Sequence, residues 1–550
     1  MEITIPKKTG TYADALHAIG ASDLLHELCG ELPQIIDQGS EFKVVVAEKR
    51  SPQRWPSPSP GYPYIWDSQK EQKPPTGDVL DYRAEIDRRN AMREFSKQAT
   101  KGKTRKQVAA QMQQHDVEKP AGPKPELVIA SMLASMRKGW SGDRQLYRWL
   151  TEDPSRALAW TKFRLNVASD RVPDPSWSNT QFLNPITGKG VHSAKTVAKA
   201  ANAINSELVD PFEDWLRLRA CFKAMLAYRD GDDFKFFVIE PTDIAHTAIE
   251  RVIAKVRDLS LWGGVRLDIL AVLRATETLI GHSEFMPQGS IPIKGKSPRK
   301  VIAGFCQAYF KSLGTAAALM NNALLPFPDW FDLHTSNDAL QMLMLIKEFI
   351  GSQDHPGCLN SLDEKHSDDG AILQQFRNWL NSGELVDFLS FTVAFALHLM
   401  QRRARQEWAR PFSTENLTFL LSRGYNMNEI VSNPGFLSIA RAVRNATIYS
   451  VGDGSVDIET RFGLAQKWKQ KLKGGDSEFL GAVGEFIQDY NWEVIHRRNR
   501  KYHVISTTDL DQLAQLIQGH GAETVGLLLL AYGYAQAPKA EPKVSAQGAD

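Results

Sequence analysis

Clusters of lysine and arginine are the residues whose type and spacing best fit a chemical task in this 550-residue chain. Guanidinium and ammonium groups bind phosphate oxygens, so neighbouring cations suit a polyanion such as DNA or RNA. Arg441 and Arg444 stand one helical turn apart, lysines alternate over residues 467–473, and Arg497, Arg498 and Lys501 follow closely. Solvated helix faces and helix C-termini also collect cations, so no single cluster decides the function.

Further cations lie in polar segments upstream. Residues 83–125 contain too few apolar side chains to form a core, and we expect a mobile basic loop there. A second basic loop spans residues 291–300, and an arginine-rich run follows residue 400. The candidate contacts in these three segments are Lys101, Lys103, Arg105, Lys106, Lys294, Lys296, Arg299, Lys300, Arg402 and Arg403.

The segment Asn184–Gly190 contains a Gly-Lys-Gly turn ahead of a stretch rich in alanine and lysine. It departs from the phosphate-binding G-x-x-x-x-G-K-[ST] pattern, because no glycine stands five residues before Gly188. Hydrolysis of a nucleoside triphosphate is therefore not supported. Such a turn still suits a nucleic-acid phosphate, with Asn184, Thr187 and Lys189 as candidate contacts and Asn184 or Lys189 at base edges. An ordinary turn before a helix remains an equal alternative.

Catalytic motifs are missing from the sequence. The chain has no H-E-x-x-H zinc motif, no nucleophile elbow and no G-x-G-x-x-G turn. The four cysteines are far apart and fit neither a zinc site nor a disulfide framework. We therefore expect a protein without catalytic activity, metal or cofactor.

Composition is that of a soluble globular protein, with 42% hydrophobic and 24% charged residues and a net charge of +2. The N-terminus lacks an apolar signal core, and the apolar run 525–531 is too short to span a bilayer. We expect a cytoplasmic location and no contact with membranes.

The elements that must position these cations differ between the two ends of the chain. The first part predicts a helix after Thr11, a strand over 42–46, a helix from Pro211 and a hairpin around Gly231. The spacing of Ile302, Phe305, Tyr309 and Phe310 predicts another helix. The end of the chain predicts a bundle, because apolar residues recur at helical spacing over 436–446, 479–494, 510–517 and 525–532.

The expected fold class is α+β: a mixed α/β amino-terminal region followed by a C-terminal helical bundle. We expect the α/β region over residues 1–400, a connecting helix over 401–426, the bundle over 427–537 and a disordered tail over 538–550.

Short motifs resemble the large subunits of type I CRISPR Cascade surveillance complexes, and most closely the type I-B-related branch of cyanobacteria, which includes transposon-associated complexes. The similarity spans most of the chain. The motifs lie at Asn433–Phe436, Ile439–Arg444, Arg461–Ala465, Glu485–Ile487, Tyr490–Asn491 and Leu528–Ala535, with the Asn184–Gly190 turn and the Phe234–Pro241 segment in support.

The resemblance implies a non-catalytic DNA- and RNA-binding subunit that serves antiviral defence or transposition. Its amino-terminal region would recognise the protospacer-adjacent motif (PAM) beside the guide-RNA 5′ end, and the bundle, similar to the small subunits, would hold the displaced strand of the R-loop. Implied partners are crRNA, double-stranded target DNA, the displaced single strand, backbone and small Cascade subunits, and transposition proteins or a recruited nuclease. On this view the turn at 184–189 and the basic loops contact DNA near the PAM.

Two other functions remain open from the sequence. One is a metal-dependent nuclease with an unrecognised site, and the other is a helical scaffold that binds only proteins. Met427 also stands just ahead of the predicted bundle, where an internal start would yield a separate small subunit.

Overall fold

The computed structural model describes residues 1–47, 50–67, 77–100, 107, 125–132, 142–175, 177–180, 182–185, 191–193, 210–259, 261–313, 317–352, 355–448, 458–496 and 502–537. These residues confirm the α+β class, with strands in the first part of the chain and helices throughout. The chain forms two compact units. Unit 1 comprises Met1–Gly263, Arg274–Glu284 and Gln288–Phe327, and unit 2 comprises Gly264–Leu273, Phe285–Pro287 and Pro328–Asp550.

The described part of unit 1 contains two antiparallel four-stranded sheets. The first has the order β1-β3-β2-β10, and the second has the order β12-β11-β9-β8. Small two-stranded pairs are β4 with β5 and β6 with β7. The strands are β1 (Glu2–Pro6), β2 (Gln34–Asp37), β3 (Glu41–Val45), β4 (Tyr64–Trp66), β5 (Val79–Asp81), β6 (Ser178–Thr180), β7 (Val191–Ser193), β8 (Met225–Asp230), β9 (Asp233–Pro241), β10 (Asp243–Ala245), β11 (Ile302–Ser312) and β12 (Ala317–Pro326).

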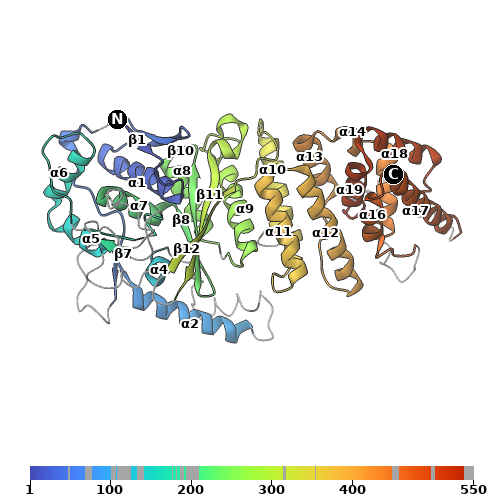
Figure 1. Cartoon of the computed structure of the whole chain (residues 1–550), viewed down its shortest axis with the longest axis horizontal. Coiled ribbons are helices and arrows are strands. Elements are labelled where there is room, and N and C mark those ends of the chain that lie inside the picture. The colour runs from blue at the N-terminus through green and yellow to red at the C-terminus, as the bar shows by residue number, and fades with distance from the viewer. Residues whose placement is uncertain are drawn as a thin grey trace, which may run out of the picture. The chain divides into compact units, whose positions relative to one another are not determined.

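Helix α1 (Tyr12–Cys29) is the buried centre of unit 1. Thr11 caps its start by accepting a hydrogen bond from the Ala13 backbone N–H, as the sequence predicts. The helix contacts α7 (Pro211–Ala224) and strands of both large sheets (Figure 1). At Gly20 the two helices approach so closely that a Cβ atom would lie 1.8 Å from the Leu216 carbonyl oxygen.

Further helices surround this centre. They are α2 (Tyr82–Thr100), α4 (Pro125–Met132), α5 (Gly142–Glu152), α6 (Pro154–Arg164), α8 (His246–Arg257) and α9 (Val265–Gly281), with short 3₁₀ turns at Pro52–Arg54, Lys294–Lys296 and Pro298–Lys300. Helix α9 contributes residues to both units.

Unit 2 is helical in its described residues. Its helices are α10 (Ser336–Ile350), α11 (Ser367–Ser382), α12 (Leu385–Ala404), α13 (Thr414–Tyr425), α14 (Asn428–Val431), α15 (Pro434–Asn445), α16 (Leu464–Leu472), α17 (Asp476–His496), α18 (Thr507–His520) and α19 (Ala522–Gly533), with a 3₁₀ turn at Cys358–Ser361. Aromatic side chains fill the core between α10, α11 and α12, where Trp330 and Trp379 stack with ring centroids 5.1 Å apart.

Several sequence expectations agree with these elements. The predicted strand over 42–46 corresponds to β3, the predicted hairpin to β8 and β9, and the four apolar stripes to α15, α17, α18 and α19. Within the described residues, every helix is too short or too polar to cross a lipid bilayer.

Other expectations differ from the structure. The helix predicted from residue 302 is wrong, because that segment is strand β11, paired with β9 on one side and β12 on the other. The expected connecting helix over 401–426 is interrupted between α12 and α13. The units divide near residue 328 rather than 400. Helix α2 occupies the start of the expected basic loop, and the tail over 538–550 lies outside the described residues.

Candidate functional site

The basic turn at residues 294–300 is held in place by Arg299. Its side-chain N–H donates to the Phe327 carbonyl at 2.5 Å, and the Thr242 hydroxyl donates to the Arg299 carbonyl at 2.9 Å. Ser297 caps the second 3₁₀ turn by accepting from the Arg299 backbone N–H at 3.1 Å. Arg299 is therefore an anchor of the turn, half-buried against the end of β12.

Lys296 and Lys300 are the exposed cations of this turn. Lys296 and the preceding Gly295 both have φ of 62°, a left-handed conformation that is uncommon for a lysine. A Cβ atom at position 295 would lie 2.8 Å from the Lys300 side chain, so a larger residue there would have to displace Lys300. The backbone thus presents two ammonium groups to solvent from an anchored turn; the Lys294 side chain lies outside the described residues.

Asn184 is not at the surface. The segment Phe182–Pro185 is buried, Asn184 is 1% exposed, and the Tyr12 hydroxyl donates to the Phe182 carbonyl at 2.7 Å. The expectation that Asn184 reaches a base edge is therefore wrong, because the segment packs against α1. Thr187 and Lys189 lie outside the described residues.

Arg444 is buried, so the expectation of an exposed pair with Arg441 is wrong. Its guanidinium donates to the carbonyls of Ala535 at 2.6 Å and Tyr532 at 2.8 Å, at the C-terminus of α19. A cation is favourable there, because the last helical carbonyls lack partners within the helix. The sequence carried a signal: Phe436, Ala440 and Arg444 recur at spacing four on the apolar stripe.

Arg441, in contrast, is exposed on α15. Burial lowers the pKa of His503, and the positive charge of Arg441 lowers it further, which places the two side chains near each other.

His496 ends α17, and Trp492, one turn earlier, is 58% exposed with its ring stacked on His496 at a centroid distance of 4.2 Å.

The arginines after residue 400 are engaged locally. Arg402 pairs with Glu407 at 2.8 Å and donates to the Trp408 carbonyl, and Arg403 donates to the Ile448 carbonyl. Burial lowers the pKa of Arg403. Arg402 therefore stabilises the chain after α12, and Arg403 joins α12 to the segment after α15.

The remaining sequence candidates lie outside the described residues. They are Lys101, Lys103, Arg105, Lys106, Arg497, Arg498 and Lys501.

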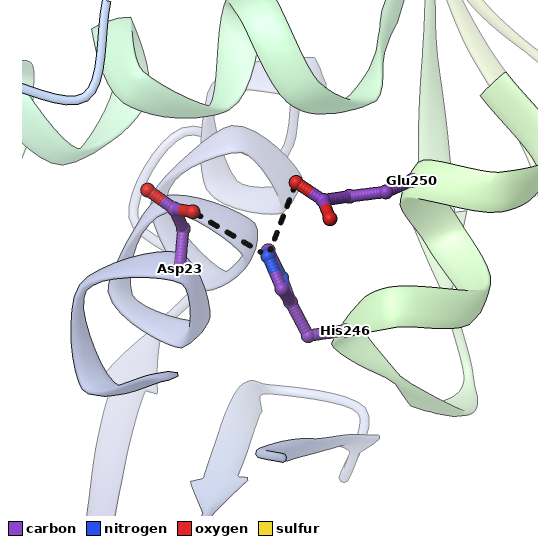
Figure 2. A group of neighbouring side chains, drawn as sticks. All are labelled: Asp23, His246 and Glu250. Carbon is purple, nitrogen blue, oxygen red and sulfur yellow. Dashed lines mark ion pairs between the residues drawn. The ribbon is translucent and has the colours of Figure 1, made fainter. Parts of the chain in front are cut away.

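A group that the sequence did not predict joins the buried Asp23 and His246 to the partly exposed Glu250 (Figure 2). Asp23 comes from α1, and the other two lie one turn apart at the start of α8. The His246 Nε2 atom is 3.5 Å from Asp23 Oδ1 and 3.6 Å from Glu250 Oε1. One nitrogen and two carboxylate oxygens are ligands that a divalent transition metal accepts.

Cations from α7 surround the same carboxylates. Arg219 contacts Asp23 at 2.5 Å and Glu27 at 2.8 Å, and Lys223 lies 3.0 Å from Glu250 Oε1 and 3.9 Å from Asp23 Oδ1. Burial alone would raise the pKa of Asp23, but Arg219, His246 and Lys223 together outweigh it and hold the pKa well below its ordinary value. Interactions with His246 and Lys223 lower the pKa of Glu250 to about 2.

His246 shows the opposite balance. Its complete burial disfavours the charged imidazole, but the neighbouring carboxylates outweigh burial and raise the pKa of the side chain. The spacing of His246 and Glu250, four residues apart on one helix, was the only signal of this group in the sequence, and Asp23 joins them through tertiary packing.

Unit 2 contains a chain of polar contacts in the order serine, histidine, aspartate. The Ser361 Oγ atom lies 3.1 Å from His398 Nε2, and His398 Nδ1 lies 3.0 Å from Asp369 Oδ1. Such an order occurs in nucleophilic triads. Here Ser361 and His398 are buried, and the serine hydroxyl also donates to the Cys358 carbonyl at 3.1 Å. The contacts therefore join the Cys358–Ser361 turn, α11 and α12 as part of the core.

A scan against models of protein families found none that matches this chain, and a search of curated proteins found no match. The functional assignment accordingly rests on the residues of the chain itself.

Proposed function

We propose that the chain is the non-catalytic large subunit of an RNA-guided DNA-targeting Cascade complex of type I-B-like kind, which recognises the PAM and stabilises the R-loop. The motifs of the sequence that resemble this family support the proposal, and so does the combination of an α/β first part with a helical second part. Guide pairing would supply sequence specificity, and the protein would supply cationic contacts and strand separation.

The observation that carries the proposal is the turn at residues 294–300. Lys296 and Lys300 are exposed on a backbone that Arg299 and Ser297 hold in one conformation. Ammonium groups on a fixed backbone bind phosphates without first ordering a flexible loop, so less backbone entropy is lost on binding.

The surface of α17 gives secondary support for contact with a single strand. Trp492 is exposed and stacked on His496, and Arg441 is exposed on α15. Exposed aromatic rings and cations are the groups that single-strand binding without sequence preference uses.

The test is co-expression of the chain with candidate backbone and small subunits and a CRISPR array. We expect crRNA to copurify with the chain and the assembly to bind PAM-containing target DNA. A chain that never enters a ribonucleoprotein, with its partners expressed and assembled, contradicts the proposal.

A metal-dependent nuclease is the second candidate function, because Asp23, His246 and Glu250 converge in unit 1. Cleavage of DNA by the purified chain in Mn²⁺, lost in an Asp23→Asn variant that keeps its fold, would favour this activity.

A scaffold that binds only proteins would instead assemble normally after neutralisation of Lys296, Lys300 and Arg441.

A further inference from the structure

The convergence of Asp23, His246 and Glu250 has the spacing of a metal site. Ligand atoms around a tetrahedral Zn²⁺ lie about 3.3 to 3.6 Å apart, because each bond is about 2.0 to 2.2 Å long. The His246 nitrogen lies 3.5 and 3.6 Å from the two carboxylate oxygens, and the ligand atoms of all three residues are within 4.8 Å of one another. One ion can therefore contact all three after small side-chain movements.

The environment of His246 is a second and independent indication. The side chain is 0% exposed, and neither ring nitrogen has a hydrogen-bond partner among the described residues. The separations of 3.5 and 3.6 Å exceed those of a good hydrogen bond. Buried polar nitrogens without partners are rare and call for an explanation, of which an unplaced ion is one.

Lys223 occupies the cation position in the present arrangement. Its ammonium approaches the same Asp23 Oδ1 and Glu250 Oε1 atoms that face His246. The Lys223 side chain is 39% exposed, so it can move into solvent and leave these oxygens to another cation. Arg219 holds the other Asp23 oxygen, Oδ2, and can remain in place.

The charges of this group are compatible with a divalent ion. Asp23, Glu27 and Glu250 supply three negative charges, and Arg219 neutralises one of them. A divalent ion would supply the two positive charges that balance the other two.

We infer that Asp23, His246 and Glu250 form a binding site for one divalent transition-metal ion of the Zn²⁺ class, for which Lys223 competes. The ion links α1 to α8, and Lys223 moves outward when it binds. A histidine nitrogen with two carboxylate oxygens suits Zn²⁺ or Co²⁺, and leaves a fourth position for water. The bound ion would stabilise the packing of α1 against α8 within unit 1. The site does not depend on the proposed contacts with nucleic acid.

The experiment uses the full chain, stripped with a chelator and titrated with Co²⁺, whose visible absorption reports tetrahedral coordination. We expect one Co²⁺ per chain, displaced by Zn²⁺. Lys223→Met should bind several-fold more tightly, because the competing ammonium is gone. His246→Gln should bind at least about ten-fold more weakly, since even loss of an outer-shell partner weakens metal sites by this amount.

His503→Gln is the matched control, because it removes a half-buried histidine in unit 2 and should bind Co²⁺ like the unmodified chain. Binding that survives in a folded His246→Gln chain overturns the inference. If that variant does not fold, Lys223→Met decides alone: tighter binding supports the site, and absent, equal or weaker binding overturns it.

Discussion

Arg441 and Arg444 are adjacent cations of one helix, and their surroundings give them different tasks. Arg444 donates two hydrogen bonds to the end of α19 from a buried position, whereas Arg441 is exposed. From residue type and spacing alone, we expected both arginines to be available to nucleic acid. What separates the two arginines is the apolar face of α15. Phe436, Ala440 and Arg444 follow one another at intervals of four residues, so Arg444 lies on the buried face and Arg441 does not.

Substitution of Arg444 by Met should destabilise unit 2. The change removes two charge-assisted hydrogen bonds to buried carbonyls, and we expect a loss of about 2–4 kcal/mol in the free energy of unfolding. Urea denaturation of the full chain measures it. Arg441→Met is the matched change and should leave stability nearly unaltered while weakening DNA binding by the assembled complex. Equal stability of the two variants contradicts the assignment.

Neutralisation of Lys296 and Lys300 should weaken target-DNA binding to a similar extent for all sequences. Each lost phosphate contact should also reduce the slope of log affinity against log salt concentration by about 1. Binding titrations of the assembled complex at several salt concentrations measure both effects. The double change Lys255→Ala with Lys347→Ala removes two exposed lysines elsewhere and serves as the control for net charge. An unchanged salt slope in the Lys296 and Lys300 variant would exclude the turn from the interface.

At the scale of secondary structure, α11 and α12 are joined by Asp369 and His398. Burial lowers the pKa of His398 despite the neighbouring carboxylate. The unfolded chain therefore binds a proton more readily than the folded chain. Stability is fully present above the ordinary histidine pKa and falls as the pH drops from there toward the lowered folded-state pKa.

Unfolding by urea at a series of pH values from about 7 to 5 should show this loss, with a slope of at most about 1.4 kcal/mol per pH unit for one histidine. His398→Gln should reduce the slope. His17 and His503 also have pKa values lowered by burial, so part of the dependence should remain. A slope identical to that of the unmodified chain would mean that His398 is not protonated on unfolding in this range.

Several elements that the sequence predicted have one apolar face and one polar face. Helices α15 and α17 belong to this class, and their stripes match their buried residues. Strand β11 does not, because it lies between two strands and buries residues on both faces. The apolar side chains of β11 fall at helical spacing by coincidence. Only the pairing with strands distant in the sequence shows that the segment is a strand and not a helix.

At the scale of the whole chain, the bundle that begins near Met427 is part of a larger unit. Helix α12 packs on α19 and α16, and the Tyr532 hydroxyl donates to the Thr418 hydroxyl at 2.8 Å. The Gln536 backbone N–H donates to the Phe412 carbonyl at 2.6 Å. A product of an internal start would lack these partners and leave apolar residues of α19 uncovered.

Fragments 328–550 and 427–550 should therefore differ in stability. We expect a cooperative thermal transition for the longer fragment, and a lower transition temperature or aggregation for the shorter, because burial of apolar surface is the main stabilising contribution. Circular dichroism during heating measures both. Equal transition temperatures would show that the bundle folds without α12 and α13.

The α+β class followed from local patterns, but the position of the boundary did not. Residues 328–400 contain α10, α11 and most of α12, and only the contacts among distant helices assign them to unit 2. The Asp23, His246 and Glu250 group could not be predicted for the same reason, since its first member is brought to the others by the packing of α1 against its neighbours.

The close approach of α1 and α7 at Gly20 has a consequence for sequence change at this position. An alanine there would force the helix axes apart, because its methyl group meets the Leu216 carbonyl oxygen rather than a movable side chain. Arg219 is carried by the same helix as Leu216, so the separation would stretch its 2.5 Å contact with Asp23. The residue at position 20 therefore sets the distance between α1 and α7. With a bulkier residue there, the ion pair would form only if position 23 carried a longer acidic side chain or position 219 a different cation.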